Sequence, residues 1–178
     1  FWLILFLCGT FCSAVFPFTV HAPRFLQKKF DMSPAMGGQY TSYIMTASMI
    51  FTPILGLIVD KFGRRGKMMI VGSLMIIPAH LLLGLTRVHP AVGFILLGCA
   101  FSLVPAALWP AVPILVREKF LGTAYGIIGW VQNIGLTIFP FLAGIIVDQQ
   151  GDNVVQGYTN MQWMFASLSI AGLIFAIM

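Results

Sequence analysis

Six long apolar stretches joined by short polar connections are the feature that most constrains how this chain can fold. Each stretch has about the 20 residues that a helix needs to cross the hydrocarbon core of a bilayer. We expect helices at about 1–27, 34–60, 67–86, 90–116, 122–148 and 160–178. Hydrophobic residues make up 59% of the chain and charged residues only 8%, against roughly a quarter in soluble domains. The sequence therefore predicts an all-α, polytopic membrane protein whose residues 1–178 form a single six-helix unit.

The charged residues lie at the ends of these stretches and indicate how the chain is oriented in the bilayer. Ten basic and five acidic residues give a net charge of +5. Because of where they lie, we interpret them as a sign of orientation in a lipid bilayer, and we expect no nucleic-acid partner. The connections after the second and fourth stretches carry six bases, Lys61, Arg64, Arg65, Lys67, Arg117 and Lys119. The other four bases are Arg24, Lys28, Lys29 and Arg87. The positive-inside rule then predicts that the first set lies in the cytoplasm.

The connection after the second stretch, GLIVDKFGRRG at residues 56–66, is typical of a tight, charged hairpin on the membrane surface. We expect Gly56 to let two helices approach closely and Gly63 to supply a positive φ for the chain reversal. Asp60 is expected to accept hydrogen bonds from helix N-terminal amides or from an arginine, with Arg64 as its partner. The alternative is an ordinary basic loop with no moving part. The motif positions are Gly56, Asp60, Lys61, Gly63, Arg64 and Arg65.

Prolines inside the first and fourth stretches predict interruptions of those helices. A proline removes one backbone hydrogen bond, and inside a membrane the opened backbone must face protein or a cavity. We expect Pro17 to kink or open the first helix, which makes the segment 16–18 a candidate gate, with a static kink as the alternative. Pro110 and Pro113, three residues apart, are expected to loosen the fourth helix.

Polar and aromatic side chains at membrane depth are the candidates for a substrate cavity. Gln39 and Tyr43 are four residues apart and so share one helix face. Gln132 and Asn133 fall near the bilayer midplane, where unpaired amides are costly. Trp109 is expected to line a pocket wall and not to anchor at the interface. We predict a cavity lined by Phe16, Gln39, Tyr43, Trp109, Gln132 and Asn133. The alternative for the two adjacent amides is hydrogen bonding to neighbouring helices.

One histidine in the third stretch and two glycines in the fifth are interpreted as packing features. An ionisable residue at the depth of His80 is by default a functional candidate. No acid accompanies it, however, so we expect a neutral imidazole bonded to a backbone carbonyl. Gly122 and Gly126 have the small-xxx-small spacing of close helix contacts.

No catalytic or metal-binding set is visible in the sequence. The five acids are scattered, no histidine has a second ligand at metal spacing, and no nucleophile elbow or phosphate loop occurs. Cys8, Cys12 and Cys99 lack CxxC spacing and are expected to be buried apolar fillers. We therefore expect no enzyme, no metal and no cofactor. Half of a transporter or a non-transporting membrane scaffold subunit remains, and the deep amides and prolines favour the transporter.

The hairpin resembles the loop signature of the major facilitator superfamily. In that signature a glycine stands four residues before an acid, which is followed by a base, any residue, a glycine and two bases, and the six positions match here from Gly56 to Arg65. The runs ALWP at 107–110, LGTAYG at 121–126 and QNIGL at 132–136 are similar to the C-terminal half of the lysosomal dipeptide transporter branch. Because both ends of the chain lie inside apolar runs, it also looks like a portion of a longer protein.

This resemblance implies transport of a small-molecule substrate by alternating access, as uniport of dipeptides out of lysosomes. It implies two partners as well, the N-terminal six-helix half of the same transporter and a glycosylated accessory membrane protein. The first, second, fourth and fifth helices are then expected to line the central cavity, with the third and sixth outside. The alternatives are another small organic anion or nutrient with proton coupling supplied by the missing half, and another endomembrane or the plasma membrane as the location.

Overall fold

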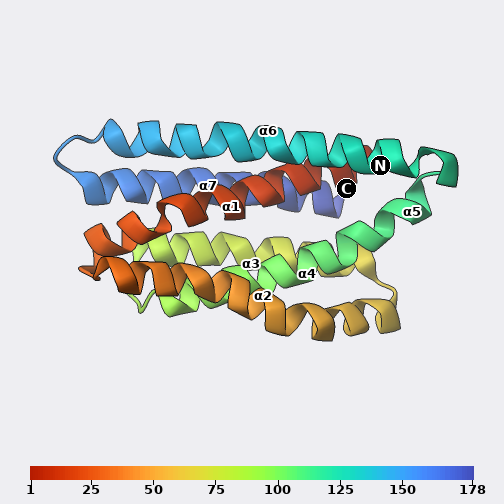
Figure 1. Ribbon diagram of the computed structural model, residues 1–178, viewed down its shortest axis with the longest axis horizontal. Coiled ribbons are helices and arrows are strands. Elements are labelled where there is room, and N and C mark those ends of the chain that lie inside the picture. The colour runs from red at the N-terminus through yellow and green to blue at the C-terminus, as the bar shows by residue number, and fades with distance from the viewer.

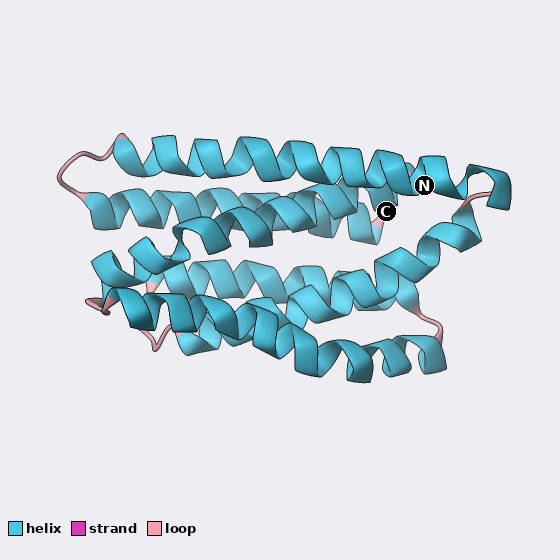
Figure 2. Cartoon of the chain, viewed as in Figure 1, coloured by secondary structure: helices cyan, strands magenta, loops and turns pink.

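Long helices make up almost the whole chain in the computed structural model, which describes residues 1–178 (Figures 1 and 2). Six helical segments are long and apolar enough to cross a membrane, and the predicted all-α, six-helix class is confirmed. The elements are α1 (Trp2–Phe30), α2 (Pro34–Phe62), α3 (Arg65–Leu85), α4 (Ala91–Leu108), a 3-10 turn (Trp109–Ala111), α5 (Val112–Leu115), a second 3-10 turn (Glu118–Phe120), α6 (Leu121–Asp148) and α7 (Val154–Ile177). The fourth crossing consists of α4, the first turn and α5 together.

Local capping explains where several helices begin and end. α2 starts at the predicted place, because the Ser33 side chain accepts a hydrogen bond from the Met36 amide and Pro34 occupies the first turn. α7 begins at Val154, several residues before the expected start near 160. The reason is Asn153, whose side chain accepts from the Gln156 amide and caps the helix inside a stretch interpreted as a loop.

Two three-helix groups build the bundle. α1 packs against α6 and α7, whereas α4 packs against α2 and α3, and α3 packs against α7. The main pairings are the same when α1 is exchanged with α4, α2 with α6 and α3 with α7. The first three and the last three crossings are therefore related as in an inverted repeat. In Figure 1, α1, α6 and α7 lie together above α2, α3 and α4. The most buried crossings are α1 and α4, and the least buried are their flanking partners α2 and α6.

The connections gather at two ends of the bundle. The α2–α3 hairpin and the α5–α6 connection lie at one end, here called the hairpin end, beside both chain termini (Figure 1). The α1–α2, α3–α4 and α6–α7 connections lie at the other, here called the far end. The six bases that the sequence assigns to the cytoplasmic side therefore share the hairpin end.

Phe18 occupies the centre of the core, where helices from both groups meet. Its ring centroid lies 5.8 Å from that of Phe25, 5.6 Å from Phe94 on α4, 6.2 Å from Phe165 on α7 and 5.5 Å from His80 on α3. The side chain is fully buried. Phe18 is therefore part of the packed core, and the gate expected at 16–18 stays a prediction.

Pro17 does not interrupt α1, so the expected opening is absent, whereas the kink stays a prediction. The helix continues from Trp2 to Phe30 through both Pro17 and Pro23. Pro17 is buried among neighbouring helices, and such packing supports a helix that has lost one hydrogen bond. The fourth crossing is different, because its α-helix gives way to a 3-10 turn that contains Pro110 and resumes as the short α5 around Pro113.

The close helix crossings involve glycines other than the predicted ones. A Cβ on Gly135 of α6 would lie 1.9 Å from the Ser13 hydroxyl oxygen of α1, so the two backbones meet there. A Cβ on Gly56, Gly122 or Gly126 would meet nothing within 4 Å. The expectation that these three let helices approach closely is wrong within this chain, because each lies on a face that no other helix of the bundle covers.

Candidate functional site

The hairpin end is organised by Arg65, the first residue of α3. α2 ends at Gly63, whose φ of 62° provides the predicted left-handed turn. Arg64 follows in a non-helical conformation and is exposed. The side chain of Arg65 turns back, with Nη2 3.6 Å from Oδ1 of Asp60. The expected pair between Asp60 and Arg64 is therefore not formed, because the turn at Gly63 brings the second arginine, and not the first, back toward α2.

The same guanidinium links the hairpin to the interrupted fourth crossing. Nη1 of Arg65 donates a hydrogen bond of 3.0 Å to the carbonyl oxygen of Pro110, inside the 3-10 turn between α4 and α5. Asp60 is 68% exposed and Arg65 24% exposed, so the ion pair alone contributes only about 0–1 kcal/mol. The bond to Pro110 adds a second, directional contact. Arg65 thus joins the end of α2, the start of α3 and the break after α4.

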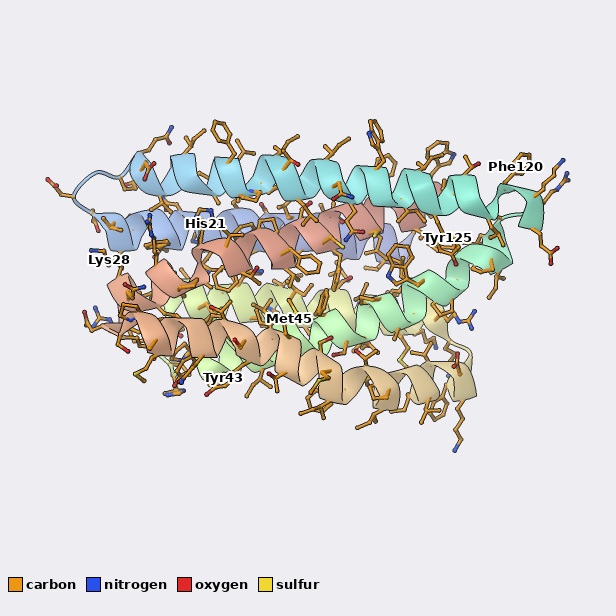
Figure 3. The ribbon with its side chains drawn as sticks, viewed as in Figure 1. His21, Lys28, Tyr43, Met45, Phe120 and Tyr125 are labelled. Atoms are coloured by element: carbon orange, nitrogen blue, oxygen red, sulfur yellow. The ribbon has the colours of Figure 1, made fainter.

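Trp109 packs next to this break, at the hairpin end. Its ring centroid is 5.9 Å from that of Tyr125 on α6, and the Tyr125 hydroxyl donates to the Trp109 carbonyl oxygen at 3.3 Å. Figure 3 labels Tyr125 close to the hairpin end of α6. Trp109 therefore lies closer to the hairpin end than the amides of α6 do. It forms a wall between the fourth and fifth crossings near the side with the most basic residues.

The two adjacent amides lie near the middle of α6, as predicted. Gln132 follows the start of α6 at Leu121 by eleven residues, or about 16 Å along the helix. The Asn133 side chain donates to the Gly129 carbonyl oxygen of its own helix at 2.7 Å, and Gln132 makes no hydrogen bond within the chain. Neither amide binds a neighbouring helix. Asn133 is exposed and Gln132 half-buried, so α6 presents free polar groups at the depth where hydrocarbon would be most costly.

The remaining candidates lie on α1 and α2 and do not join the amides in one cluster. Phe16 on α1 is half-buried and packs edge-on against Phe101 of α4, with ring centroids 5.0 Å apart. Gln39 and Tyr43 are exposed in the first part of α2, toward the far end. The ring of Tyr43 lies 5.0 Å from that of Tyr40. The predicted cavity residues are thus spread along the bundle, from Trp109 at one end to Gln39 near the other.

Sequence reasoning missed the polar partner of His80. The Nδ1 atom of His80 lies 2.7 Å from Oε1 of Gln162 on α7. The expected partner, a backbone carbonyl, is replaced by a side-chain amide. Gln162 could have been noticed as the one amide that follows Met161 in an otherwise apolar stretch.

Lys29 is the second residue whose role the sequence did not reveal. Its ammonium donates to the carbonyl oxygens of Leu83 and Gly84, at the C-terminal end of α3, and it is only 7% exposed. The last carbonyls of a helix lack intrahelical partners and carry a partial negative charge, so a lysine there satisfies both needs. The spacing of four residues from the buried Phe25 places Lys29 on the inner face of α1 and was the available signal.

Comparisons with known proteins point to one family. Residues 1–178 match the profile described as Major Facilitator Superfamily. Over 150 residues, or 84% of this chain, the sequence is 36% identical to the human protein named "Lysosomal dipeptide transporter MFSD1" and covers 32% of that protein. The proteins of the same name from Gallus gallus and Danio rerio are each 35% identical over the same share of this chain. The chain spans about a third of the length of these relatives.

Proposed function

Because the chain belongs to the major facilitator superfamily, we propose that it forms the C-terminal six-helix half of a transporter that moves a small organic solute by alternating access. The solute proposed is a dipeptide, carried out of lysosomes. The observation that carries this proposal is the 36% identity to the human dipeptide transporter over 84% of the chain. Membership of a family of transporters also agrees with the expectation that the chain is no enzyme.

The exposed faces of α2 and α6 support the position of the cavity. These two crossings are the least buried in the chain, and both carry polar side chains at membrane depth. Asn133 and Gln132 have no partner on another helix, so in a bilayer they must meet water, a solute or another part of the protein. A dipeptide presents amide donors and acceptors, which match the side-chain amides of α6 and the hydroxyl of Tyr43 on α2.

Uniport is favoured over proton coupling by the positions of the acids. Asp60 and Asp148 lie in the last turns of α2 and α6, and Asp31, Glu118 and Asp152 lie outside the long helices. A carboxylate at midplane depth, which commonly carries protons in coupled transporters, does not occur in the residues of this chain. Transport down the solute gradient therefore needs no proton from this half.

Ligand-induced stabilisation of the full-length transporter tests the proposal. The protein is purified in detergent, and its Tm is measured with a panel of dipeptides and with small organic acids. We expect dipeptides to raise the Tm, and Gln132→Ala and Asn133→Ala to keep the fold but to reduce that increase. Val131→Ala, on the neighbouring half-buried position, is the matched control. No rise with any dipeptide would refute the substrate, and equal rises in all variants would refute the α6 face as the site.

A further inference from the structure

A polar pocket of about 370 Å³ opens at the far end of the bundle, and none of the candidate cavity residues lines it. It lies between the last turns of α1, the end of α6 and the start of α7, and Figure 3 labels Lys28 at this end of α1. Its size falls within the roughly 300–1,000 Å³ of ordinary small-molecule sites. The polar lining residues are Arg24, Gln27, Lys28, Asp148 and Tyr158.

Charges of both signs line this pocket without forming an ion pair. Arg24 and Lys28 are four residues apart on α1 and both reach the pocket, and Asp148 reaches it from α6. The chain contains a single ion pair, between Arg65 and Asp60 at the other end. The pocket therefore offers a cationic wall and a separate anionic wall, each free to bind a group of opposite charge.

The position of Asp148 strengthens its preference for a cation. It is the last residue of α6, where the backbone carbonyls already give a partial negative charge, and no basic residue occupies that last turn. An acid at a helix C-terminus is unfavourable unless a cation comes close. A bound ammonium group would satisfy both the carboxylate and the helix end.

Tyr158 and Gln27 supply neutral hydrogen-bonding groups between the two walls. Tyr158 is only 4% exposed but lines the pocket, and its hydroxyl makes no hydrogen bond within the chain. The Gln27 side chain donates one bond to the Pro23 carbonyl of its own helix and keeps its carbonyl oxygen free. Both groups can therefore accept or donate a hydrogen bond to a ligand or to water.

We propose that this pocket binds zwitterionic solutes, with the carboxylate held by Arg24 and Lys28, the ammonium by Asp148, and an amide by Tyr158 and Gln27. The inference rests on the proposed dipeptide transport and adds to it a first binding step at the far end, before the solute enters the central cavity. An ethanolamine phospholipid carries the same pair of charges on its headgroup. A dissolved dipeptide and a lipid are therefore the two sources that the experiment separates.

Protection of a pocket cysteine from a maleimide reports occupancy directly. Val154→Cys places the thiol in the lining, and Val155→Cys, its exposed neighbour outside the pocket, is the matched control. Both are made in the full-length protein with its other reactive cysteines replaced. Diglycine at about ten times its dissociation constant should slow modification of Val154→Cys roughly tenfold by mass action and leave Val155→Cys unchanged.

The charge assignments are tested by removing one charge at a time. Acetylated diglycine lacks the ammonium and diglycinamide lacks the carboxylate, so each should protect far less than diglycine. When Asp148→Asn or Arg24→Gln is combined with Val154→Cys, diglycine should no longer protect the cysteine from the maleimide. Dihexanoyl phosphatidylethanolamine tests the lipid as the source of the two charges. If this lipid protects the cysteine and diglycine does not, the pocket binds a lipid headgroup. Protection that survives both substitutions, or no protection by either zwitterion, overturns the proposal.

Uptake of diglycine into proteoliposomes, measured in parallel, separates this inference from the proposed function. Protection without uptake would support binding in the pocket and refute dipeptide transport. Uptake without protection, with an unchanged KM in Asp148→Asn, would support dipeptide transport and refute the pocket as a binding site.

Discussion

His80 on α3 and Gln162 on α7 form a hydrogen-bonded pair across the interface between the two three-helix groups. Nδ1 and Oε1 are 2.7 Å apart, and the two residues are 0% and 1% exposed. The rings of Phe18 and Phe165 each lie 5.5 Å from the imidazole. A specific polar pair in such apolar surroundings fixes the register of α3 against α7, since sliding either helix would separate the two groups.

Replacing one member of this pair should destabilise the protein more than replacing both. Gln162→Leu leaves the buried imidazole without its partner, which costs about 1–3 kcal/mol. His80→Phe leaves the side-chain oxygen of Gln162 without its partner, at a similar cost. The double variant buries two apolar side chains, leaves neither polar group without a partner, and should cost less than either single replacement. Thermal unfolding of the full-length protein in detergent measures all three. Strictly additive losses would mean that the hydrogen bond does not couple the helices.

Arg65 and Arg64 should differ strongly in their effect on transport, although they are neighbours. Arg65→Gln removes both the contact with Asp60 and the bond to Pro110. A charge-assisted hydrogen bond contributes about 1.5 kcal/mol or more, so transport should slow roughly tenfold if these contacts stabilise one access state. Arg64→Gln, an exposed residue without either contact, is the control. Equal transport rates in the two variants would show that the contacts of Arg65 do not stabilise an access state, and the basic hairpin would then only orient the chain in the membrane.

Asp60→Asn should slow transport less than Arg65→Gln does. It removes the ion pair, which is partly exposed, and leaves the bond between Arg65 and the Pro110 carbonyl in place. Substrate binding, followed as ligand-induced stabilisation, should remain. A variant that no longer binds solute would indicate that Asp60 acts at the cavity and not at the hairpin.

Gly135→Ala should impair folding, whereas Gly126→Ala should not. The new methyl group at 135 would collide with the Ser13 hydroxyl, and overpacking of this kind costs about 1–3 kcal/mol. At 126 the methyl group meets nothing within the chain. Yield and Tm of the purified variants are the measurements. Because the collision is with one side chain, Ser13→Gly should restore part of the stability of Gly135→Ala, and its failure to do so would contradict this contact.

Lys29→Met should lower stability, and Lys29→Arg should preserve most of it. Methionine matches the length of the lysine stem but leaves the carbonyls of Leu83 and Gly84 unsatisfied, at about 1–3 kcal/mol for buried groups. Arginine keeps a donor at the same position. Thermal unfolding compares the two. If Lys29→Met unfolds at the wild-type temperature, the ammonium does not hold α1 to the end of α3.

The sequence was sufficient for the fold because the length of an apolar stretch and the bilayer thickness leave few alternatives. The family was recognised from the hairpin and the runs in the fourth and fifth stretches, and the match over residues 1–178 confirms it. The start of α7 was missed because Asn153 was interpreted as part of a polar loop, although asparagine is also a strong N-cap. Composition alone does not separate these two roles.

Contacts between helices were predicted poorly, and for a physical reason. Spacing shows which residues share one face of a helix, but not which helix covers that face. Gly126 and Gly135 have equally good sequence contexts, yet only Gly135 meets a neighbour. In the same way, the choice of Arg65 over Arg64 depends on the backbone after Gly63, and the partners of His80 and Lys29 lie on helices far away in the sequence.

The pairing of α1 with α6 and α7 has a consequence for how the protein is made. α1 is the most buried crossing, but the two helices that it contacts most, α6 and α7, are synthesised after α2, α3 and α4. Until they are inserted, Ser13 and Gly9, which pack against α6 in the finished bundle, have only lipid or the insertion machinery as neighbours. Chains truncated before α6 are therefore expected to expose this face of α1 and to be substrates for membrane quality control.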